Sequence, residues 1–295
     1  MTDHLLEWLH LLLRWTHVLA AVSWIGNSFY FMWLDRALEP PAQPGGKVAG
    51  TLWMVHSGGF YRVEKRVRGA GEVPPVLHWF KYEALVTALS GVALLLLVYH
   101  YGGIVIDAGE TTLGPWAALG LAVGLFVAGW FVYDALWMSP LAKQPAVAIA
   151  ISYLLVVACA WGLGHVYSGR ATFLHVGALL GTLMVTNVWA RILPAQRDMI
   201  AAAHRGGERD PALAKRAKQR SVQNSYMTLP VVFLMLSPHF PSTYGHKHAW
   251  LIFAVAGLAG GAFRHFMIVP NRRTVWLAVG AVAALVALAG WTASG

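Results

Sequence analysis

The segment that decides the fold is HSGGFYRVEKRVRGAGEVPPVLHWFKYEALVTALSG, residues 56–91. It begins as a polar stretch rich in lysine and arginine and runs without a break into an apolar helix. Four titratable residues stand where the chain enters hydrocarbon: His56, His78, Lys81 and Glu83. A charged side chain is costly at that depth unless it is paired or faces a water-filled cavity, so these four are candidates for a functional site.

The composition indicates a membrane protein. The chain has 295 residues, of which 57% are hydrophobic and only 12% are charged, whereas soluble domains have about 25% charged residues. Eight apolar segments are each long enough to cross about 30 Å of hydrocarbon. The sequence therefore predicts an all-α polytopic membrane helical bundle, forming a single integral membrane domain over residues 1–295. The predicted spans are 11–34, 77–99, 113–136, 145–166, 171–193, 222–240, 247–269 and 274–293.

Lysine and arginine predict the orientation of these spans. They gather in two long loops, about 35–79 and 194–221, which the positive-inside rule places in the cytoplasm, with both termini outside. The net charge of +9 comes largely from such loops. It therefore indicates contact with membrane lipid and not with nucleic acid. Cys159 is the only cysteine, which excludes a disulfide framework, a cysteine-rich zinc site and a C-x-x-C-H haem attachment.

Two histidines are predicted to lie at similar depth in the outer half of the bundle. His17 lies about 9 Å and His175 about 6 Å into their spans at 1.5 Å per residue. Both spans run from outside to inside before a long basic loop, and HVLA at 17–20 resembles HVGA at 175–178, which suggests a parallel 4+4 repeat. Facing histidines hold a six-coordinate haem, so we predict that this pair ligates haem b, with Arg14 on a propionate. A buried histidine bonded to a backbone carbonyl is the alternative.

A second group is predicted at the cytoplasmic side. It combines cations, histidines and aromatic rings, which suit a flat, anionic, hydrogen-bonding ligand. A positive collar with interfacial aromatics is the alternative interpretation. A second haem between His78 and His265 is a further prediction. The members of the group are His56, Phe60, Tyr61, His78, Trp79, Lys81, Arg264 and His265, with Asn224 and Tyr226 facing the same region.

Four blocks of sequence resemble the bacterial membrane-bound urate oxidase (urate hydroxylase) family. They are LLLRWTHVLAAVSWIGNSFYFMWLD (11–35), HSGGFYRVEK with LHWFKYEA (56–84), SGRATFLHVGALLGT (168–182) and AKQRSVQNSYMTLPVVFLMLS (217–237). The second and fourth blocks are specific. The first also resembles membrane-type protoporphyrinogen oxidases and copper-resistance membrane proteins. The chain departs from the expected pattern at Gln223, where we expect His, and at Ser57, where we expect Gly.

The resemblance implies a multi-pass protein of the bacterial inner membrane that takes part in purine catabolism. It implies oxidation of urate to 5-hydroxyisourate, with electrons passed to a c-type cytochrome or another respiratory carrier. Members typically carry a cytochrome c domain after the last span, and here we expect a separate carrier. In this interpretation Lys81 holds the anion, Phe60 or Tyr61 stacks on it, and Glu83 or His56 takes a proton.

Two other functions remain open from the sequence. One is a haem-containing membrane oxidase of the protoporphyrinogen oxidase type. The other is a metal transporter of the copper-resistance type, which would use Met227, Met235 and the outer histidines.

Overall fold

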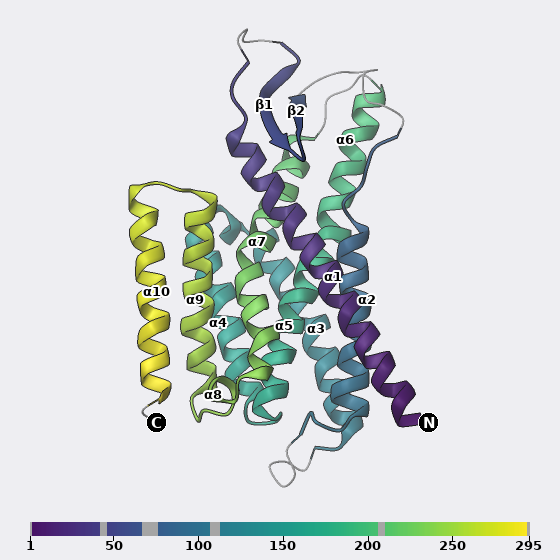
Figure 1. The fold of residues 1–295 in the computed structure, drawn as a ribbon, viewed down its shortest axis with the longest axis vertical. Helices are drawn as coiled ribbons and strands as arrows, with labels where there is room; N and C mark the ends of the chain where they lie inside the picture. The colour runs from purple at the N-terminus through teal and green to yellow at the C-terminus, as the bar shows by residue number, and fades with distance from the viewer. Residues whose placement is uncertain (1, 42–45, 67–75, 107–112, 206–209, 294–295) are drawn as a thin grey trace.

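Long helices dominate the architecture, as predicted. The structure is a computed structural model that describes residues 2–41, 46–66, 76–106, 113–205 and 210–293. Seven helices in the described part are long and apolar enough to cross a membrane, and Figure 1 shows them packed side by side. This is the architecture of a membrane protein and confirms the all-α bundle. The helices longer than twelve residues are α1 (Thr2–Ala37), α2 (Tyr82–Leu94), α3 (Pro115–Met138), α4 (Pro145–Leu163), α5 (Gly169–Asn187), α6 (Leu193–Arg205), α7 (Pro211–Leu236), α9 (Ala249–Ile268) and α10 (Arg272–Ala293).

Short helical segments complete these elements. Two π-helical segments, η1 (Leu95–Tyr101) and η3 (Val188–Ile192), continue α2 and α5. Because α6 follows η3 directly, one continuous rod runs from Gly169 to Arg205. The remaining elements are short: η2 (Pro140–Lys143), η4 (Ser237–His239) and α8 (Pro241–Tyr244).

The eighth predicted span, 222–240, lies mostly within α7. This helix begins at Pro211, and its first ten residues include Lys215, Arg216, Lys218 and Arg220. These charges, together with the polar residues Gln219, Gln223 and Asn224, explain why α7 is not among the seven apolar helices. It nevertheless packs between α5 and α9 within the bundle. The predicted loop 194–221 is therefore largely helical where the structure describes it.

Local sequence accounts for several helix starts. Pro115, Pro145 and Pro211 stand at the first position of α3, α4 and α7, where the missing N–H is not needed. The Asp210 carboxylate accepts a hydrogen bond from the backbone N–H of Ala212 at 2.8 Å and caps α7. Ser168 caps α5 in the same way.

The predicted loop 35–79 contains a β-hairpin that the sequence analysis did not anticipate. Strands β1 (Val48–His56) and β2 (Gly59–Arg66) pair antiparallel. Ser57 and Gly58 join them with φ values of 49° and 76°, as a two-residue type I′ turn requires. Glycine adopts this conformation at lower cost than serine, which gives a physical reason to expect glycine at position 57.

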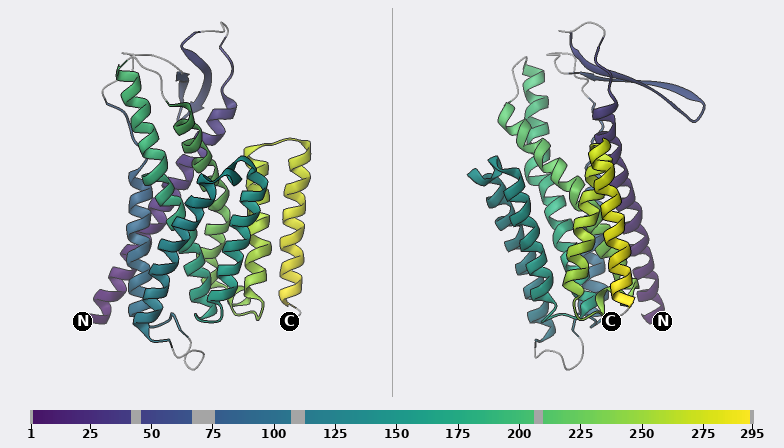
Figure 2. Two further views of the ribbon diagram at one scale, coloured as in Figure 1. Left: turned by 180° about the vertical axis from the view of Figure 1, so that it is seen from behind. Right: turned by 90° about the vertical axis from the view of Figure 1, so that its left-hand side faces the viewer.

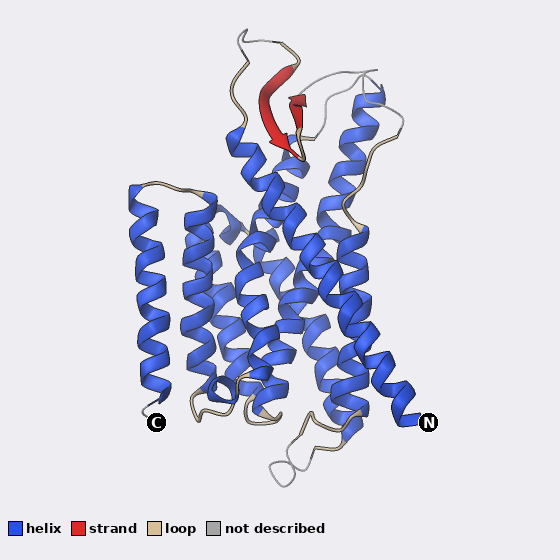
Figure 3. Cartoon of the chain, in the orientation of Figure 1, coloured by secondary structure: helices blue, strands red, loops and turns tan. Residues whose placement is uncertain are grey.

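The hairpin and the termini lie at opposite ends of the bundle. Figure 1 shows the hairpin and α6 at one end and both marked termini at the other, and Figure 2 shows the hairpin projecting sideways from the helices. Lys65 on β2 contacts Asp35 near the end of α1 at 2.5 Å and ties the hairpin to that helix. Figure 3 shows the hairpin as the strand-containing part of an otherwise helical chain, over the residues described.

The core of the bundle is centred on α5. Eleven of its residues are buried, including Phe173, His175 and Asn187. Helices α2, α3, α4 and α7 surround it, α9 packs against α4 and α7, and α1 and α10 pack at the edge. The buried polar side chains of α5, such as His175 and Asn187, must therefore find hydrogen-bond partners inside the bundle.

Candidate functional site

A buried arginine on α9 is the central feature of the half of the bundle nearer to the hairpin. The Arg264 residue is only 3% exposed, and its Nε and Nη2 donate to the Ser225 hydroxyl at 2.9 and 2.7 Å. Its guanidinium carbon lies 3.4 Å from the centroid of the Phe29 ring. No carboxylate in the described ranges forms an ion pair with it. The positive charge of Arg264 is therefore held in place without being neutralised.

A hollow of about 320 Å³ lies beside this guanidinium, between α1 and α9. Three aromatic rings of α1 line it, together with apolar side chains from both helices. We call this hollow the Arg264 pocket. One cation and several aromatic planes around a small space are suited to a flat anion. The lining residues are Phe29, Tyr30, Met32, Trp33, Arg264, Met267 and Ile268.

The next residue on each helix forms a second polar pair. The Tyr226 hydroxyl and His265 Nδ1 lie 2.6 Å apart, so consecutive residues of α7 bind consecutive residues of α9. A phenol bonded to an imidazole can relay a proton. Pro230 lies one turn further along α7 and has no N–H to bond the carbonyl of Tyr226. The backbone of α7 therefore lacks one helical hydrogen bond close to the position where its polar side chains gather.

A third polar cluster joins α3, α7 and the η3 segment. The Asp134 carboxylate binds both Arg191 and Arg220, and it accepts from Arg220 Nη2 at 2.7 Å. Arg220 is 2% exposed, and its other terminal nitrogen, Nη1, has no partner in the structure. This cluster was not among the predicted sites. A lone acid inside an apolar span was the available signal, because such a residue needs a buried partner.

Amides extend that cluster towards the centre of the bundle. Asn187 Nδ2 donates to Asn224 Oδ1 at 2.8 Å and to the Tyr133 hydroxyl at 3.1 Å. Tyr133 in turn donates to Gln223. Asn224 was predicted to contact substrate, and the structure places it here, bonded to Asn187 and to the carbonyl of Met184.

The chain matches the family model described as Urate oxidase N-terminal over residues 3–293. The chain belongs to the urate oxidase N-terminal family. No curated protein matches it in a comparable search, and no solved structure does. At family level it is therefore an oxidoreductase related to urate oxidation. The QNSY segment, 223–226, supplies Ser225 and Tyr226 to the two α7–α9 pairs, so one specific block of the family resemblance lies next to the Arg264 pocket.

For this family member, three predicted site residues lie on the hairpin and not in the bundle. His56, Phe60 and Tyr61 are exposed, and the Phe60 residue is 82% exposed. His56 Nδ1 contacts the Ser57 hydroxyl at 2.8 Å. Among the described residues, no hydrogen bond, ion pair or ring contact joins them to Lys81 or Glu83. The hairpin projects to one side, and the structure does not bring the three into a site with α2.

Lys81 and Glu83 lie at the start of α2. Lys81 Nζ stands 4.9 Å from the Trp79 ring and 5.0 Å from the Tyr82 ring. Glu83 Oε1 accepts from Asn27 Nδ2 at 3.4 Å, while its Oε2 is buried without a partner.

Helix α1 separates this group from Arg264. Asn27 contacts Glu83, and Phe29, two residues later, contacts Arg264. Two residues correspond to a rotation of about 200° around a helix, so the two contacts are on opposite faces of α1. The cations that the sequence analysis placed in one site therefore occupy two, one on each side of α1.

The predicted haem ligands find other neighbours. His17 Nδ1 contacts the carbonyl of Thr87 at 2.9 Å and the Ser90 hydroxyl at 3.2 Å. His175 Nε2 instead faces His100 Nε2 at 3.3 Å. The structure thus does not bring His17 and His175 together, and it pairs His175 with His100, which was not among the predicted haem ligands.

The predicted second pair is also not brought together. His78 packs edge-on against the Phe80 ring at 4.5 Å, whereas His265 contacts Tyr226. The described part of the chain contains no group of three or more histidine, cysteine, aspartate or glutamate side chains that could hold a bare metal ion.

Proposed function

We propose that this protein oxidises urate, or a closely related flat anionic purine, with the substrate bound in the Arg264 pocket. The observation that carries the proposal is the uncompensated charge of the buried Arg264 beside an open, ring-lined hollow. Burying a cation without a counter-ion costs several kcal/mol. An anionic substrate would supply the missing negative charge. Relief of the desolvation cost of Arg264 would then contribute to the free energy of substrate binding.

The donors of Arg264 support this role. Apart from the bonds to Ser225, its terminal nitrogens face only methionine sulfur, with Nη1 3.9 Å from Met267 Sδ and Nη2 3.7 Å from Met32 Sδ. Sulfur is a weak acceptor, so a substrate oxygen or nitrogen can replace it with a net gain. The purine plane would lie against the aromatic rings of α1.

The chemistry assigns roles to neighbouring groups. When urate becomes 5-hydroxyisourate, two electrons and two protons leave, and a water molecule contributes the new hydroxyl oxygen. The Tyr226–His265 pair is the nearest proton acceptor to Arg264 along both helices. Glu83, with one buried oxygen free, is a second acceptor on the α2 side, where Lys81 would attract the anion from the cytoplasm. The electrons would pass to a c-type cytochrome or another respiratory carrier.

The arrangement of the ends supports the proposed orientation in a bacterial inner membrane. Both termini lie at one end of the bundle, and the basic hairpin and α6 lie at the other. We place the hairpin end in the cytoplasm, by the positive-inside rule, and both termini outside. Urate is formed in the cytoplasm, which is the side nearer to the Arg264 pocket.

Substitution of Arg264 tests the proposal. Arg264→Met should weaken urate binding by more than tenfold in titration calorimetry of the purified protein, while Arg264→Lys should retain part of it. Arg273→Met, at an exposed arginine on the same end of the bundle, is the matched control and should bind normally. Thermal stability of Arg264→Met should be unchanged or higher, because an unpaired buried charge is removed. Wild-type urate affinity in Arg264→Met would overturn the site, and no urate binding by the wild-type protein would overturn the function.

A further inference from the structure

Two histidines face each other nitrogen to nitrogen in the outer half of the bundle. His175 is fully buried on α5, and its Nε2 lies 3.3 Å from Nε2 of His100 on η1. The rings are nearly perpendicular, at 82°, with centroids 5.4 Å apart. Tyr99, the residue before His100, also meets the His175 ring edge-on at 6.2 Å. The π-helical turn of η1 thus presents two consecutive side chains to one buried imidazole.

Hydrogen bonding fixes which nitrogen of His175 is free. Its Nδ1 lies 2.7 Å from the backbone carbonyl of Ala171, which can only accept, so Nδ1 carries the proton. The Nε2 of the neutral ring is therefore unprotonated, and its lone pair can accept a hydrogen bond from His100 Nε2. A ring held by a backbone carbonyl with its other nitrogen unprotonated is the arrangement of a histidine that binds a metal.

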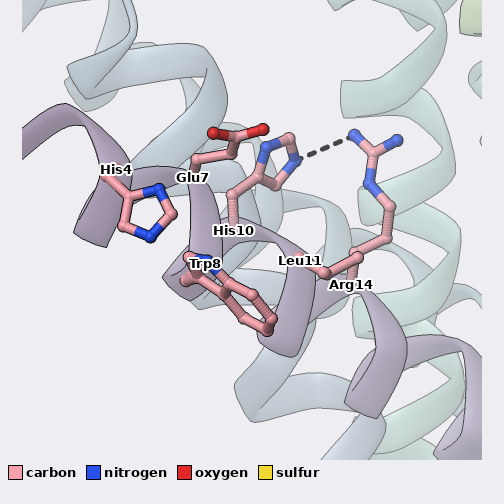
Figure 4. A pocket seen from close by; sticks show the side chains of 6 residues that line it. All are labelled: His4, Glu7, Trp8, His10, Leu11 and Arg14. Atoms are coloured by element: carbon pink, nitrogen blue, oxygen red, sulfur yellow. Dashed lines mark hydrogen bonds between the residues drawn. The ribbon is translucent and has the colours of Figure 1, made fainter.

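Two arginines with uncompensated charge stand near this pair. Arg170, at the start of α5, lies beside the Tyr99 hydroxyl, and its Nε is buried without a partner. Arg14 on α1 is close enough to interact electrostatically with the same hydroxyl. Figure 4 shows Arg14 bonded to His10, and the distance from Nη2 to Nε2 is 2.9 Å. Within the described ranges, neither arginine is paired with a carboxylate.

We propose that His100 and His175 are the two axial ligands of a haem b, and that Arg14 and Arg170 bind its propionates. A bare metal ion needs three or four protein ligands, and no such group exists in the described part of the chain. A haem leaves two positions open, which matches the two imidazoles found here. Two unpaired guanidinium groups match its two carboxylates.

The residues fit this group in type and spacing. Two imidazoles on one metal ion stand about 4 Å apart, from a bond of about 2.0 Å on each side, so the rings need to separate by less than about 1 Å from the 3.3 Å seen here. Apolar and aromatic rings surround His175, with Phe126 at 6.4 Å and Tyr167 at 4.6 Å between centroids. A hollow of about 390 Å³ lies along α1 beside Arg14, the guanidinium proposed to bind one propionate. A bound haem would supply one-electron redox chemistry at this level of the membrane.

Absorption spectra of protein purified from haem-supplied cells test the assignment without urate, so the result is independent of the proposed substrate. The wild type should contain haem b with a low-spin spectrum. His175→Ala and His100→Ala should each lose the low-spin signal. His100→Met should keep the haem with a shifted spectrum and a higher reduction potential, because sulfur replaces nitrogen at one axial position. Arg170→Gln should lower the haem content.

Two controls separate this pair from other histidines. His17→Ala and His165→Ala should retain the wild-type spectrum, since neither ring contacts His175 or His100. A wild-type spectrum in both His100→Ala and His100→Met would overturn the assignment. Loss of the low-spin signal in His17→Ala alone would also overturn it and would favour the pair expected from sequence, His17 and His175. A wild-type protein that binds no haem b would overturn it as well.

Discussion

Ser225 on α7 and Arg264 on α9 form a buried pair in which one hydroxyl accepts two hydrogen bonds, at 2.9 and 2.7 Å, from one guanidinium. The hydroxyl fixes the direction of the arginine but contributes no negative charge. A carboxylate at position 225 would have neutralised the site. The pair therefore keeps a positive charge ready for an anion at a fixed position between α1 and α9.

Removing the Ser225 hydroxyl should loosen Arg264. Because hydrogen bonds to charged groups contribute about 1.5–3 kcal/mol, we expect Ser225→Ala to raise the KM for urate about tenfold or more, with a smaller change in kcat. Ser221→Ala, one turn earlier on α7, is the control. Steady-state turnover with an artificial electron acceptor measures both constants. An unchanged KM in Ser225→Ala would show that the hydroxyl does not position the substrate-binding group.

Replacing Lys81 or Arg264 by methionine compares how much each cation contributes to urate binding. Both are cations predicted to lie at the cytoplasmic side, but they lie on opposite faces of α1, and Arg264 is much more deeply buried. We expect Arg264→Met to raise the KM for urate more than Lys81→Met. Lys81→Arg separates anchoring from substrate contact, because an anchor tolerates arginine and a confined contact does not. A larger effect from Lys81→Met would move the substrate to the α2 side, beside Glu83.

Asp134 should be important for stability. Asp134→Asn would leave Arg191 and the buried Arg220 without a counter-ion, and breaking a buried pair in this way costs about 3–5 kcal/mol. Asp35→Asn is the matched control, since the Asp35–Lys65 pair is exposed and surface pairs contribute about 0–1 kcal/mol. Unfolding in detergent, followed by tryptophan fluorescence, compares the two. Equal losses would mean that the Asp134 network does not stabilise the bundle.

Gly91 should be intolerant of any side chain. A Cβ there would lie 2.9 Å from Cε1 of His17, so Gly91→Ala must push α1 away from α2 or turn the imidazole out of its bond to Thr87. Overpacking of this kind costs about 1–3 kcal/mol. Gly120→Ala on α3 meets nothing within 4 Å and is the control. A melting temperature of Gly91→Ala equal to that of the control would show that His17 can move freely.

The orientation can be tested by labelling in intact cells. With Cys159 replaced by alanine, a cysteine at Glu110 should react with an impermeant maleimide from outside, and one at Glu208 should not. Both positions lie outside the described residues, and they flank spans whose ends the structure defines. Labelling at 208 without labelling at 110 would reverse the orientation and place both termini in the cytoplasm.

The sequence alone predicted the elements that depend on local composition. Apolar segments such as 113–136 and 145–166 became helices because hydrocarbon leaves the backbone no other way to satisfy its hydrogen bonds. It also placed Arg264, Tyr226 and His265 in the half of the bundle nearer to the loop 35–79, since depth follows from counting residues along a span. The hairpin was missed although Ser57-Gly58 between strand-like segments was a usable signal, because the flanking charges were interpreted only as topology.

Tertiary structure decided which side chains meet. Depth along a helix does not determine its rotation or its neighbours, so the sequence could not distinguish His17 from His100 as the partner of His175. Nor could it show that α1 stands between Lys81 and Arg264, or that Asp134 lies between two arginines on other elements. Composition fixed the helices and their depth. The packing of helix faces against one another decided which side chains form each site. That packing depends on all neighbouring helices together and cannot be read from one segment.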